Sequence, residues 1–305
     1  MTSRVKPSAF SSPEGMDLHV RNPVHKIMEM TLPNIFSRLS KKGDHATIVH
    51  DYPHVELFYW RPSGNRFNFG DHLAKVIVTK ILTDHNHLLE EETDVPRTLF
   101  AVGSVLHFAK KNDVVWGSGI NGKIDIKKHQ FETLDVRAVR GPLTREFLME
   151  RGIKVPAIYG DPALLMPTLF PGRFVRNPQS DYVVVPHLHD IDIAAKANLQ
   201  YVISPLSMWN RCIEDILKGE LVISSSLHGL VVAEAYGIPA RYLRLSEEEN
   251  IFKYNDYTMG TGRGEIEAAC CVEEALEMGG MPPPVFDAGQ LIAAFPFDLW
   301  NGVAL

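Results

Sequence analysis

A short polar stretch between two apolar segments contains the residues best suited to chemistry. The stretch SSSLHG covers residues 224–229, after the apolar run at 221–223 and before an apolar run at 230–236. A helix that begins here leaves its first backbone N–H groups unpaired and has the positive end of its dipole there, so it can bind an anion. His228 would lie at the same point, and its ordinary pKa near neutrality suits proton transfer. The alternative is that one serine caps the helix and His228 is structural.

Other polar residues follow the expected strands. Ligands of open parallel sheets bind beyond the carboxyl ends of the strands. Asn68 and Asp71 lie in NFGDHL, Arg140 ends a predicted strand, and the segment FKYNDY at 252–257 mixes aromatic rings with Lys253 and Asp256 in a predicted loop. These residue types fit an anion or sugar site. The structural alternatives are a helix cap for Asp71 and a hydrophobic plug for 252–257, and we interpret Asp161 in GDPALL as a structural turn.

His187 and His189 form a further pair in the segment PHLHD. Their spacing puts both on one side of a strand, at its end. A zinc site needs at least one more ligand, and no third candidate is evident in the sequence. We therefore expect no metal.

The elements around these residues alternate between strands and helices, which is typical of parallel sheets with covered faces. Strands are expected at 55–60, 98–103, 113–117, 136–140, 157–160, 181–187, 200–204, 220–224 and 240–245. Helices are expected at 71–82, 142–151, 208–218, 228–236 and near 272–279 and 287–295. The Pro- and Gly-rich segment 166–180 is the expected linker.

This alternation predicts an α/β protein of two Rossmann-like domains with a cleft between them, similar to the glycosyltransferase-B class. The expected divisions are an N-terminal arm with an amphipathic helical segment at 1–50, a first domain at 51–170, a second at 181–270 and C-terminal helices at 271–305. The amphipathic segment at 24–39 either packs on the protein or rests on a membrane surface.

The composition and charge of the chain argue against several classes of protein. The chain has 305 residues, a net charge of −6, 45% hydrophobic residues and three cysteines. The cysteines give neither a disulfide framework nor a metal motif, there is no apolar run long enough to span a membrane, and the N-terminus lacks the apolar centre of a signal peptide. No basic stretch resembles a nucleic-acid surface. We expect a cytoplasmic protein that does not bind nucleic acid.

Eight blocks in order resemble one family. They are NFGDHL, GSVLHFAK, VWGSGINGK, LDVRAVRGPLTREFL, YGDPALL, SSSLHGL, AEAYGIPA and FKYNDY, and the resemblance that they carry runs from about Phe58 to about Trp300. Together they resemble the polysaccharide pyruvyl transferase family, nearest to its members in xanthan-type exopolysaccharide synthesis.

The resemblance implies transfer of pyruvate from phosphoenolpyruvate, as co-substrate and without a cofactor, to two hydroxyls of one sugar. In the xanthan-type case these are O4 and O6 of a terminal mannose on a lipid-linked oligosaccharide. The product is a cyclic ketal, with release of phosphate. A lipid-linked acceptor would bring the protein into transient contact with the cytoplasmic face of the inner membrane.

Roles for the candidate residues follow from this resemblance. His228 is the expected acid or phosphate ligand, and Asp71 the expected base. The expected donor-binding residues are Arg140, Ser224, Ser225, Ser226, Leu227, Gly229 and Lys253, and the expected acceptor-binding residues are Asn68, His187, Tyr254 and Asp256.

One position departs from the family. Many members have Arg-Leu-His-Gly where this chain has Ser226 to Gly229, so the charge must come from Arg140 or Lys253, or the serines and helix N–H groups must suffice. Two alternatives stay open. One is a glycosyltransferase that uses a sugar nucleotide, with Glu234 on the ribose, and the other is a catalytically inactive family member.

Overall fold

The structure is a computed structural model that describes residues 52–63 and 67–300. These residues belong to one compact unit, which spans His50–Leu305. The amphipathic segment expected at 24–39 lies outside the described residues.

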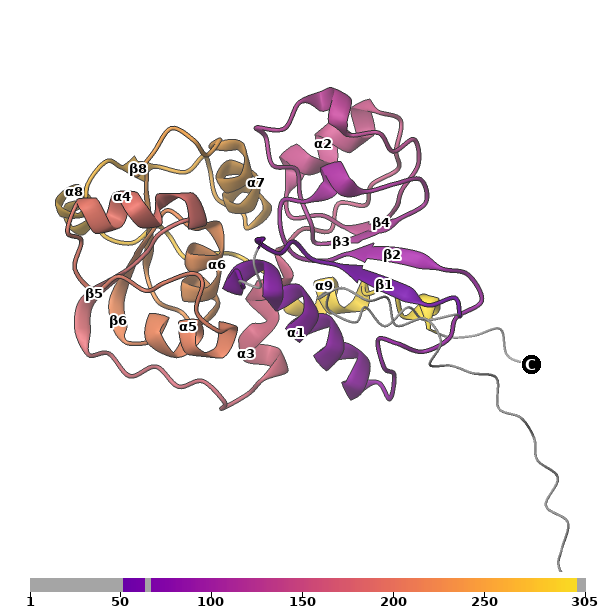
Figure 1. Cartoon of the computed structure of the whole chain (residues 1–305), viewed down its shortest axis with the longest axis horizontal. Coiled ribbons are helices and arrows are strands. Elements are labelled where there is room, and N and C mark those ends of the chain that lie inside the picture. Colours follow the sequence, from indigo (N-terminus) through magenta and orange to yellow (C-terminus); the bar gives the residue numbers. More distant parts are fainter. Residues whose placement is uncertain (1–51, 64–66, 301–305) are drawn as a thin grey trace, which may run out of the picture. The chain divides into compact units, whose positions relative to one another are not determined.

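The first half of this unit contains a parallel sheet of four strands in sequence order (Figure 1). Its strands are β1 (Val55–Phe58), β2 (Arg97–Phe100), β3 (Val114–Trp116) and β4 (Asp135–Ala138). Between β1 and β2 the chain forms helix α1 (Phe69–Asp84), and after β4 it forms α2 (Pro142–Glu150). Proline at the first position of α2 has no N–H to leave unpaired, which explains why the helix begins there.

The second half contains another parallel four-stranded sheet, again in sequence order. Its strands are β5 (Ser180–Val185), β6 (Gly219–Ser224), β7 (Ala240–Leu243) and β8 (Ala268–Ala269). The helices of this half are α4 (Ile191–Lys196), α5 (Trp209–Ile216), α6 (Leu227–Ala235), α7 (Phe252–Gly260) and α8 (Val272–Met278). The α/β class with parallel sheets is therefore confirmed.

The core explains why α6 is apolar all around. Its first eight residues are buried, and α6 packs against β6, β7, α5 and the turn at Pro162–Leu165. A helix covered on every side shows no polar stripe. The largest hydrophobic cluster includes residues from both sheets and from α1, and the expected linker contributes Met166, Leu169 and Phe174 to it. The finer arrangement of two separate glycosyltransferase-B-like domains stays a prediction.

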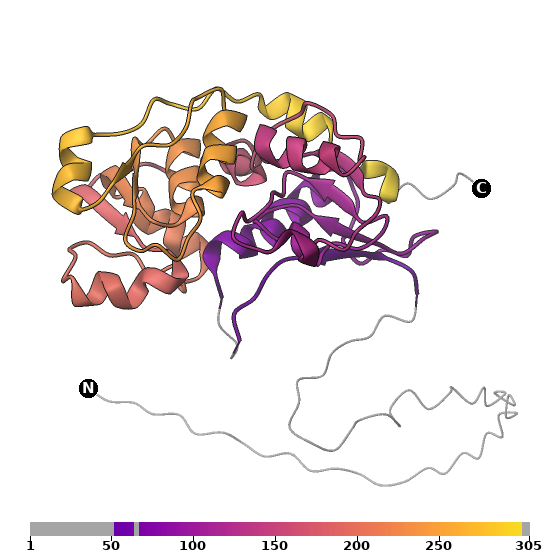
Figure 2. The same cartoon turned by 90° about the horizontal axis from the view of Figure 1, so that it is seen from above.

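The C-terminal segment returns from the second half to the first. In Figures 1 and 2 the yellow segment leaves α8 and reaches α9 (Ala288–Ala293) beside the first sheet. The indole Nε1 of Trp116, on β3, donates a hydrogen bond of 2.8 Å to the carbonyl of Leu291. This contact joins residues that are 175 positions apart.

Three expected elements differ. The loop predicted at 252–257 is wrong, because this segment forms the first two turns of α7. Tyr254 and Tyr257, spaced by three residues, are both fully buried, and burial of this pair favours the helix. The strands expected at 157–160 and 200–204 each form a single bridge, through Tyr159 and Val202, instead of a ladder.

Candidate active site

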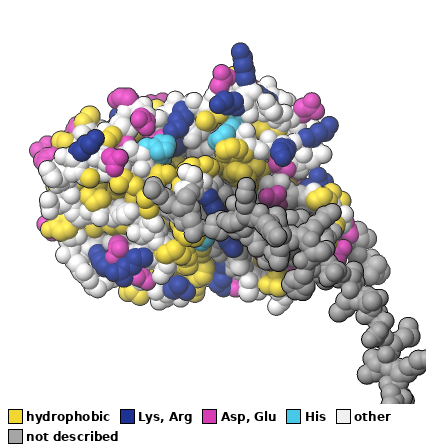
Figure 3. Space-filling view, viewed as in Figure 1, with side chains coloured by type: hydrophobic (Ala, Val, Ile, Leu, Met, Phe, Trp, Pro, Cys, Tyr) yellow, Lys and Arg dark blue, Asp and Glu magenta, His cyan; other side chains and the backbone are white. Residues whose placement is uncertain are grey.

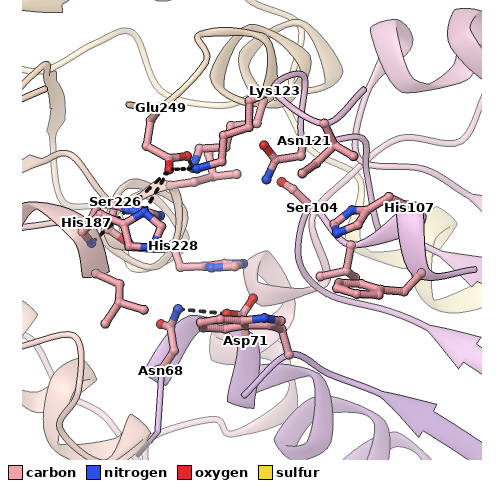
Figure 4. A pocket seen from close by; sticks show the side chains of 18 residues that line it. Asn68, Asp71, Ser104, His107, Asn121, Lys123, His187, Ser226, His228 and Glu249 are labelled. Atoms are coloured by element: carbon pink, nitrogen blue, oxygen red, sulfur yellow. Dashed lines mark hydrogen bonds and ion pairs between the residues drawn. The ribbon is translucent and has the colours of Figure 1, made fainter. Parts of the chain in front are cut away.

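A cavity of about 230 Å³ lies beside the N-terminal first turns of α1 and α6. Its walls come from both halves of the chain, as the close view in Figure 4 shows. On the face viewed in Figure 3, histidine side chains reach the surface among hydrophobic ones. The lining residues are Trp60, Asn68, Asp71, Ser104, Val105, His107, Phe108, Asn121, Lys123, Ile124, His187, Leu188, His189, Ser226, Leu227, His228, Glu249 and Lys253.

The start of α1 places Asp71 in the cavity wall. Asn68 caps this helix, since its Oδ1 accepts the N–H of Gly70 at 3.3 Å. The Asn68 Nδ2 donates to Asp71 Oδ2 at 2.8 Å, which fixes the carboxyl group. Burial raises the pKa of Asp71 from 3.8 to about 6, against the opposing effect of His228 and Lys253. Asp71 therefore exchanges its proton near neutral pH, as an acid or base catalyst must.

The serine-rich turn before α6 is mostly structural. The Ser224 hydroxyl donates to the carbonyl of Val185 at 2.8 Å and accepts the N–H of Ser226 at 3.0 Å. The Ser225 hydroxyl accepts the N–H of His187 at 2.8 Å. Gly229 packs against Ser224 and Val185, where a Cβ atom would lie 2.2 Å from the Ser224 Oγ. Among the five expected donor contacts in this turn, Ser226 and Leu227 line the cavity.

His228 lies at the start of α6 with its ring facing the start of α1. Its Nε2 is 3.6 Å from Asp161 Oδ2, and neither atom has a hydrogen-bond partner among the described residues. Asp161 is fully buried, and its other oxygen accepts the N–H of Ala163 at 2.9 Å. Asp161 thus forms the structural turn that the sequence predicts. Its Oδ2 makes no hydrogen bond with the described residues, and it faces the imidazole of His228 at 3.6 Å. Such a carboxylate orients a histidine that transfers protons.

Two lysines and one glutamate form the opposite wall. Lys123 and Lys253 both contact the carboxylate of Glu249, which is almost fully buried. Burial lowers the pKa of Lys253, although Glu249 opposes this effect. The lysines and Asp71 thus lie on different walls of one cavity, where a ligand with negative charge could contact the lysines while its reacting carbon faces Asp71.

Two cavity histidines, His187 and His107, are biased toward the neutral form. Burial, with a further contribution from Lys253, lowers the pKa of His187 to about 3. Burial and the neighbouring His129 lower the pKa of His107 to about 4. At neutral pH both rings are uncharged, so they can act as hydrogen-bond partners or ligands and add no positive charge.

Besides Ser224, Ser225 and Gly229, three more expected site residues do not line the cavity. Arg140 is buried, with Nε and Nη2 bound to Asp256 at 3.0 and 2.9 Å. Asp256 also accepts the backbone N–H and hydroxyl of Thr144 at 2.8 and 2.7 Å. The Tyr254 hydroxyl donates to the Ser225 carbonyl at 2.6 Å. These groups support the site from behind, and Arg140 reaches the wall only through Ser104, whose Oγ is 2.5 Å from Nη1.

Several cavity residues were not among the sequence candidates. Ser104, Asn121 and Lys123 follow predicted strands at glycine-rich turns, and that position is the signal by which they could have been found. Glu249 lies in an acidic loop, SEEEN, which looks like a solvated surface. Its burial depends on contacts with Lys123, which is 126 residues away. No local pattern indicates such a contact.

Comparison with known proteins decides the family. The sequence pattern described as polysaccharide pyruvyl transferase matches residues 31–247, which is more than half of the chain. The chain belongs to the polysaccharide pyruvyl transferase family. The match includes α1 with Asp71 and the start of α6 with His228.

Two curated proteins are similar to this chain. The chain is 27% identical over 218 residues to the succinoglycan biosynthesis protein ExoV of Rhizobium meliloti, covering 68% of this chain and 65% of ExoV. It is 24% identical over 189 residues to the uncharacterized protein L143 of Acanthamoeba polyphaga mimivirus, covering 55% and 62%. The chain thus spans less than two thirds of the length of each. An uncharacterized Klebsiella pneumoniae protein of known structure, KP1_0663, aligns with a TM-score of 0.44 at 13% identity, over 72% of this chain and 93% of that one.

Proposed function

We propose that this protein transfers the pyruvyl group of phosphoenolpyruvate to two hydroxyls of a terminal hexose, forming a cyclic ketal. The proposal rests on one observation within the family assignment: one cavity contains a carboxyl group that titrates near neutrality, a histidine paired with a carboxylate, and two lysines. Ketal formation from an enol phosphate needs proton transfer and charge neutralisation of this kind.

The reaction divides into two additions at one carbon. An acid protonates the methylene carbon of the donor, the first sugar hydroxyl attacks the adjacent carbon, and a base accepts the hydroxyl proton. Phosphate then leaves this tetrahedral adduct, and the second hydroxyl forms the second C–O bond as it loses its proton. Both hydroxyl oxygens end on the carbon that carried the phosphate in the donor. The proton of the second hydroxyl passes to the departing phosphate, so inorganic phosphate is the other product. In this proposal His228 is the acid and Asp71 the base.

Donor binding is assigned to the cavity wall that contains Lys123 and Lys253, and to the start of α6. Phosphoenolpyruvate has a phosphate and a carboxylate, and both need positively charged or N–H partners. Lys253 faces the cavity beside Ser226 and Leu227, at the positive end of α6. Arg140 would act through Ser104, which its guanidinium holds in the cavity wall. In this proposal Lys253 supplies the positive charge that an arginine supplies in family members with Arg-Leu-His-Gly, where this chain has Ser226.

Acceptor binding is assigned to His187, which lies beside His228, and to Asn68, which lies beside Asp71; both line the cavity (Figure 4). The acceptor we propose is a terminal mannose, bridged through O4 and O6, on a lipid-linked exopolysaccharide unit. Such an acceptor would place the protein in the cytoplasm, in transient contact with the inner membrane. Among the described residues there is no helix with the length and hydrophobicity needed to cross a membrane.

The glycosyltransferase alternative depends on Glu234. Both oxygens of this carboxylate are bound by Arg263, at 2.6 and 3.0 Å, and Glu234 accepts the Tyr257 hydroxyl at 2.5 Å. Glu234 does not line the cavity. A ribose would have to displace this network, which favours pyruvyl transfer over transfer from a sugar nucleotide.

The test begins with donor binding. Thermal unfolding is measured with phosphoenolpyruvate, and separately with UDP- and GDP-sugars, without acceptor. A ligand at about 100 times its dissociation constant stabilises the fold by about 2.7 kcal/mol. We expect stabilisation by phosphoenolpyruvate alone, followed by stoichiometric phosphate release with a mannose-terminated acceptor. Stabilisation by a nucleotide sugar only would overturn the proposal, and donor binding without turnover on any hexose acceptor would indicate an inactive member.

A further inference from the structure

The third ligand that the histidine pair lacks in the sequence is present in the fold. His187 and His189 follow β5, and Glu249 comes from the loop between β7 and α7. The Nδ1 atoms of His187 and His189 lie 3.7 and 3.6 Å from the same oxygen, Glu249 Oε1. One ligand atom from each of the three residues lies within 4.8 Å of the others.

These separations are close to those of a metal site. Zinc binds imidazole nitrogen and carboxylate oxygen at about 2.0–2.2 Å in tetrahedral geometry, so two of its ligand atoms are roughly 3.4 Å apart. The two distances to Glu249 exceed this by only a few tenths of an ångström. Two imidazoles and one carboxylate are a donor set for zinc or a similar transition metal, whereas magnesium and calcium prefer oxygen ligands alone.

The surrounding bonds prepare the His187 ring for this role. Its Nδ1 accepts the backbone N–H of His189 at 3.3 Å, so this nitrogen has a lone pair and no proton. A metal ion requires that form. The accepted bond is longer than an ordinary one, and replacing it costs little. The backbone N–H of His187 is held by the Ser225 hydroxyl at 2.8 Å, which fixes the loop.

We propose that His187, His189 and Glu249 form a binding site for one divalent transition-metal ion of the zinc type. All three residues line the cavity that Asp71 and His228 also line, so the cavity leaves room for a fourth ligand that the protein does not supply. A site with three protein ligands and one open position is the catalytic type of zinc site. The inference concerns metal binding only and does not depend on pyruvyl transfer.

The two lysines that contact Glu249 give the metal-binding proposal a more specific prediction. Lys253 contacts Glu249 Oε2, the oxygen that does not face the histidines, and can orient the carboxylate while a metal binds Oε1. Lys123 contacts Oε1 itself and competes with a metal for it. The Lys123 side chain is 32% exposed and can turn to solvent. Removing Lys123 should therefore strengthen metal binding, whereas removing any of the three ligands should weaken it.

The experiment is calorimetric titration of the untagged, chelator-treated full chain with zinc chloride and, separately, magnesium chloride. Cys270 and Cys271 are exposed and could bind zinc, so the titrations use the double variant Cys270→Ser, Cys271→Ser as the parent to which every further variant is compared. We expect one zinc ion per chain and no saturable magnesium binding. In His189→Gln and Glu249→Gln the zinc affinity should fall at least about tenfold, and in Lys123→Met it should rise.

His87→Gln is the matched control, because His87 contacts Glu91 at 3.0 Å but belongs to no group of three metal-ligating side chains within the part of the chain that the structure describes. Its zinc affinity should equal that of the parent. Glu249→Gln leaves two lysines without their partner and could fail to fold, whereas His189 is a half-exposed side chain whose replacement keeps the test decisive. Absence of saturable zinc binding, or equal zinc affinity in the parent and His189→Gln, would overturn the proposal.

Discussion

The imidazole of His228 lies directly on the backbone of Gly70. A Cβ atom added at Gly70 would be 2.2 Å from His228 Nδ1, closer than any real contact allows. Gly70 is in the first turn of α1 and His228 in the first turn of α6, so the two helices meet at this point. Glycine at position 70 allows His228 to approach Asp71, the next residue in the chain.

Gly70→Ala should therefore disturb the site more than the fold. The added methyl group must displace the His228 side chain from its present position, because it would lie 2.2 to 2.6 Å from the Nδ1, Cγ and Cβ atoms of this residue. We expect pyruvyl transfer to fall at least about 100-fold, in line with misplacement of a catalytic group by an ångström. The measurement is the rate of phosphate release from phosphoenolpyruvate with acceptor. Gly264→Ala is the control, since a Cβ there meets no atom within 4 Å; similar losses in both variants would contradict the prediction.

Asp71→Asn should remove the base while preserving its shape. The asparagine oxygen can still accept from Asn68 Nδ2, so the site geometry is kept. We expect kcat to fall about 100- to 10,000-fold. In the unmodified protein kcat/KM should rise with pH through about 6, because the base must be ionised to act. A rate that falls through this pH range would instead make Asp71 the acid.

The same substitution should have a pH-dependent effect on stability. The folded-state pKa of Asp71 is raised from 3.8 to about 6, so the folded state holds its proton more tightly than the unfolded state. Its stabilising effect is complete below pH 3.8 and is lost as pH rises through about 6, a change of about 3 kcal/mol. Relative to the unmodified protein, Asp71→Asn should gain stability between these pH values. Urea unfolding at pH 4 and pH 7.5 checks this, and equal differences at both pH values would refute it.

Asp161 and His228 should act as one unit in catalysis. Asp161→Asn keeps the bond to the N–H of Ala163 but removes the charge beside the imidazole. We expect a loss of kcat of about tenfold or more, and no further loss when it is added to His228→Gln, because coupled residues are not additive. Single-turnover rates of the two single variants and the double variant test this. The control is Asp287→Asn, because Asp287 caps the start of α9 and is distant in sequence from both residues. This substitution should leave kcat unchanged. If the losses of kcat in the two single variants added fully in the double variant, Asp161 and His228 would act independently.

Arg140 and Asp256 should prove essential to stability. Asp256→Asn leaves the guanidinium of Arg140 buried without its counter-charge, which costs about 3–5 kcal/mol of unfolding free energy. Replacing both by apolar residues, in Arg140→Met with Asp256→Leu, should cost less than Asp256→Asn alone. Urea unfolding followed by circular dichroism gives both values. If Asp256→Asn cost under about 1 kcal/mol and raised the KM for phosphoenolpyruvate, Arg140 would be a direct donor ligand.

Much of this protein follows from local sequence. The alternation of apolar strands and helices predicts the parallel α/β class, because side chains repeat every two residues in a strand and every 3.6 in a helix. The stretch at 224–229 indicates the start of α6, where a serine, Ser226, is the N-cap. NFGDHL indicates the start of α1, but the cap is Asn68 and not Asp71, and the helix begins at Phe69 instead of residue 71. The family assignment likewise follows from ordered motifs.

The tertiary structure alone decided which polar residues share the cavity. Glu249 and Lys123 join it from segments 126 positions apart, and no periodicity encodes a contact over that separation. The same is true of Arg140, which the sequence places at the end of a strand and the fold pairs with Asp256, 116 residues away. Asp161 lies outside the lining and contacts it through His228. The raised pKa of Asp71 is also a tertiary property, because it comes from burial by both halves of the chain.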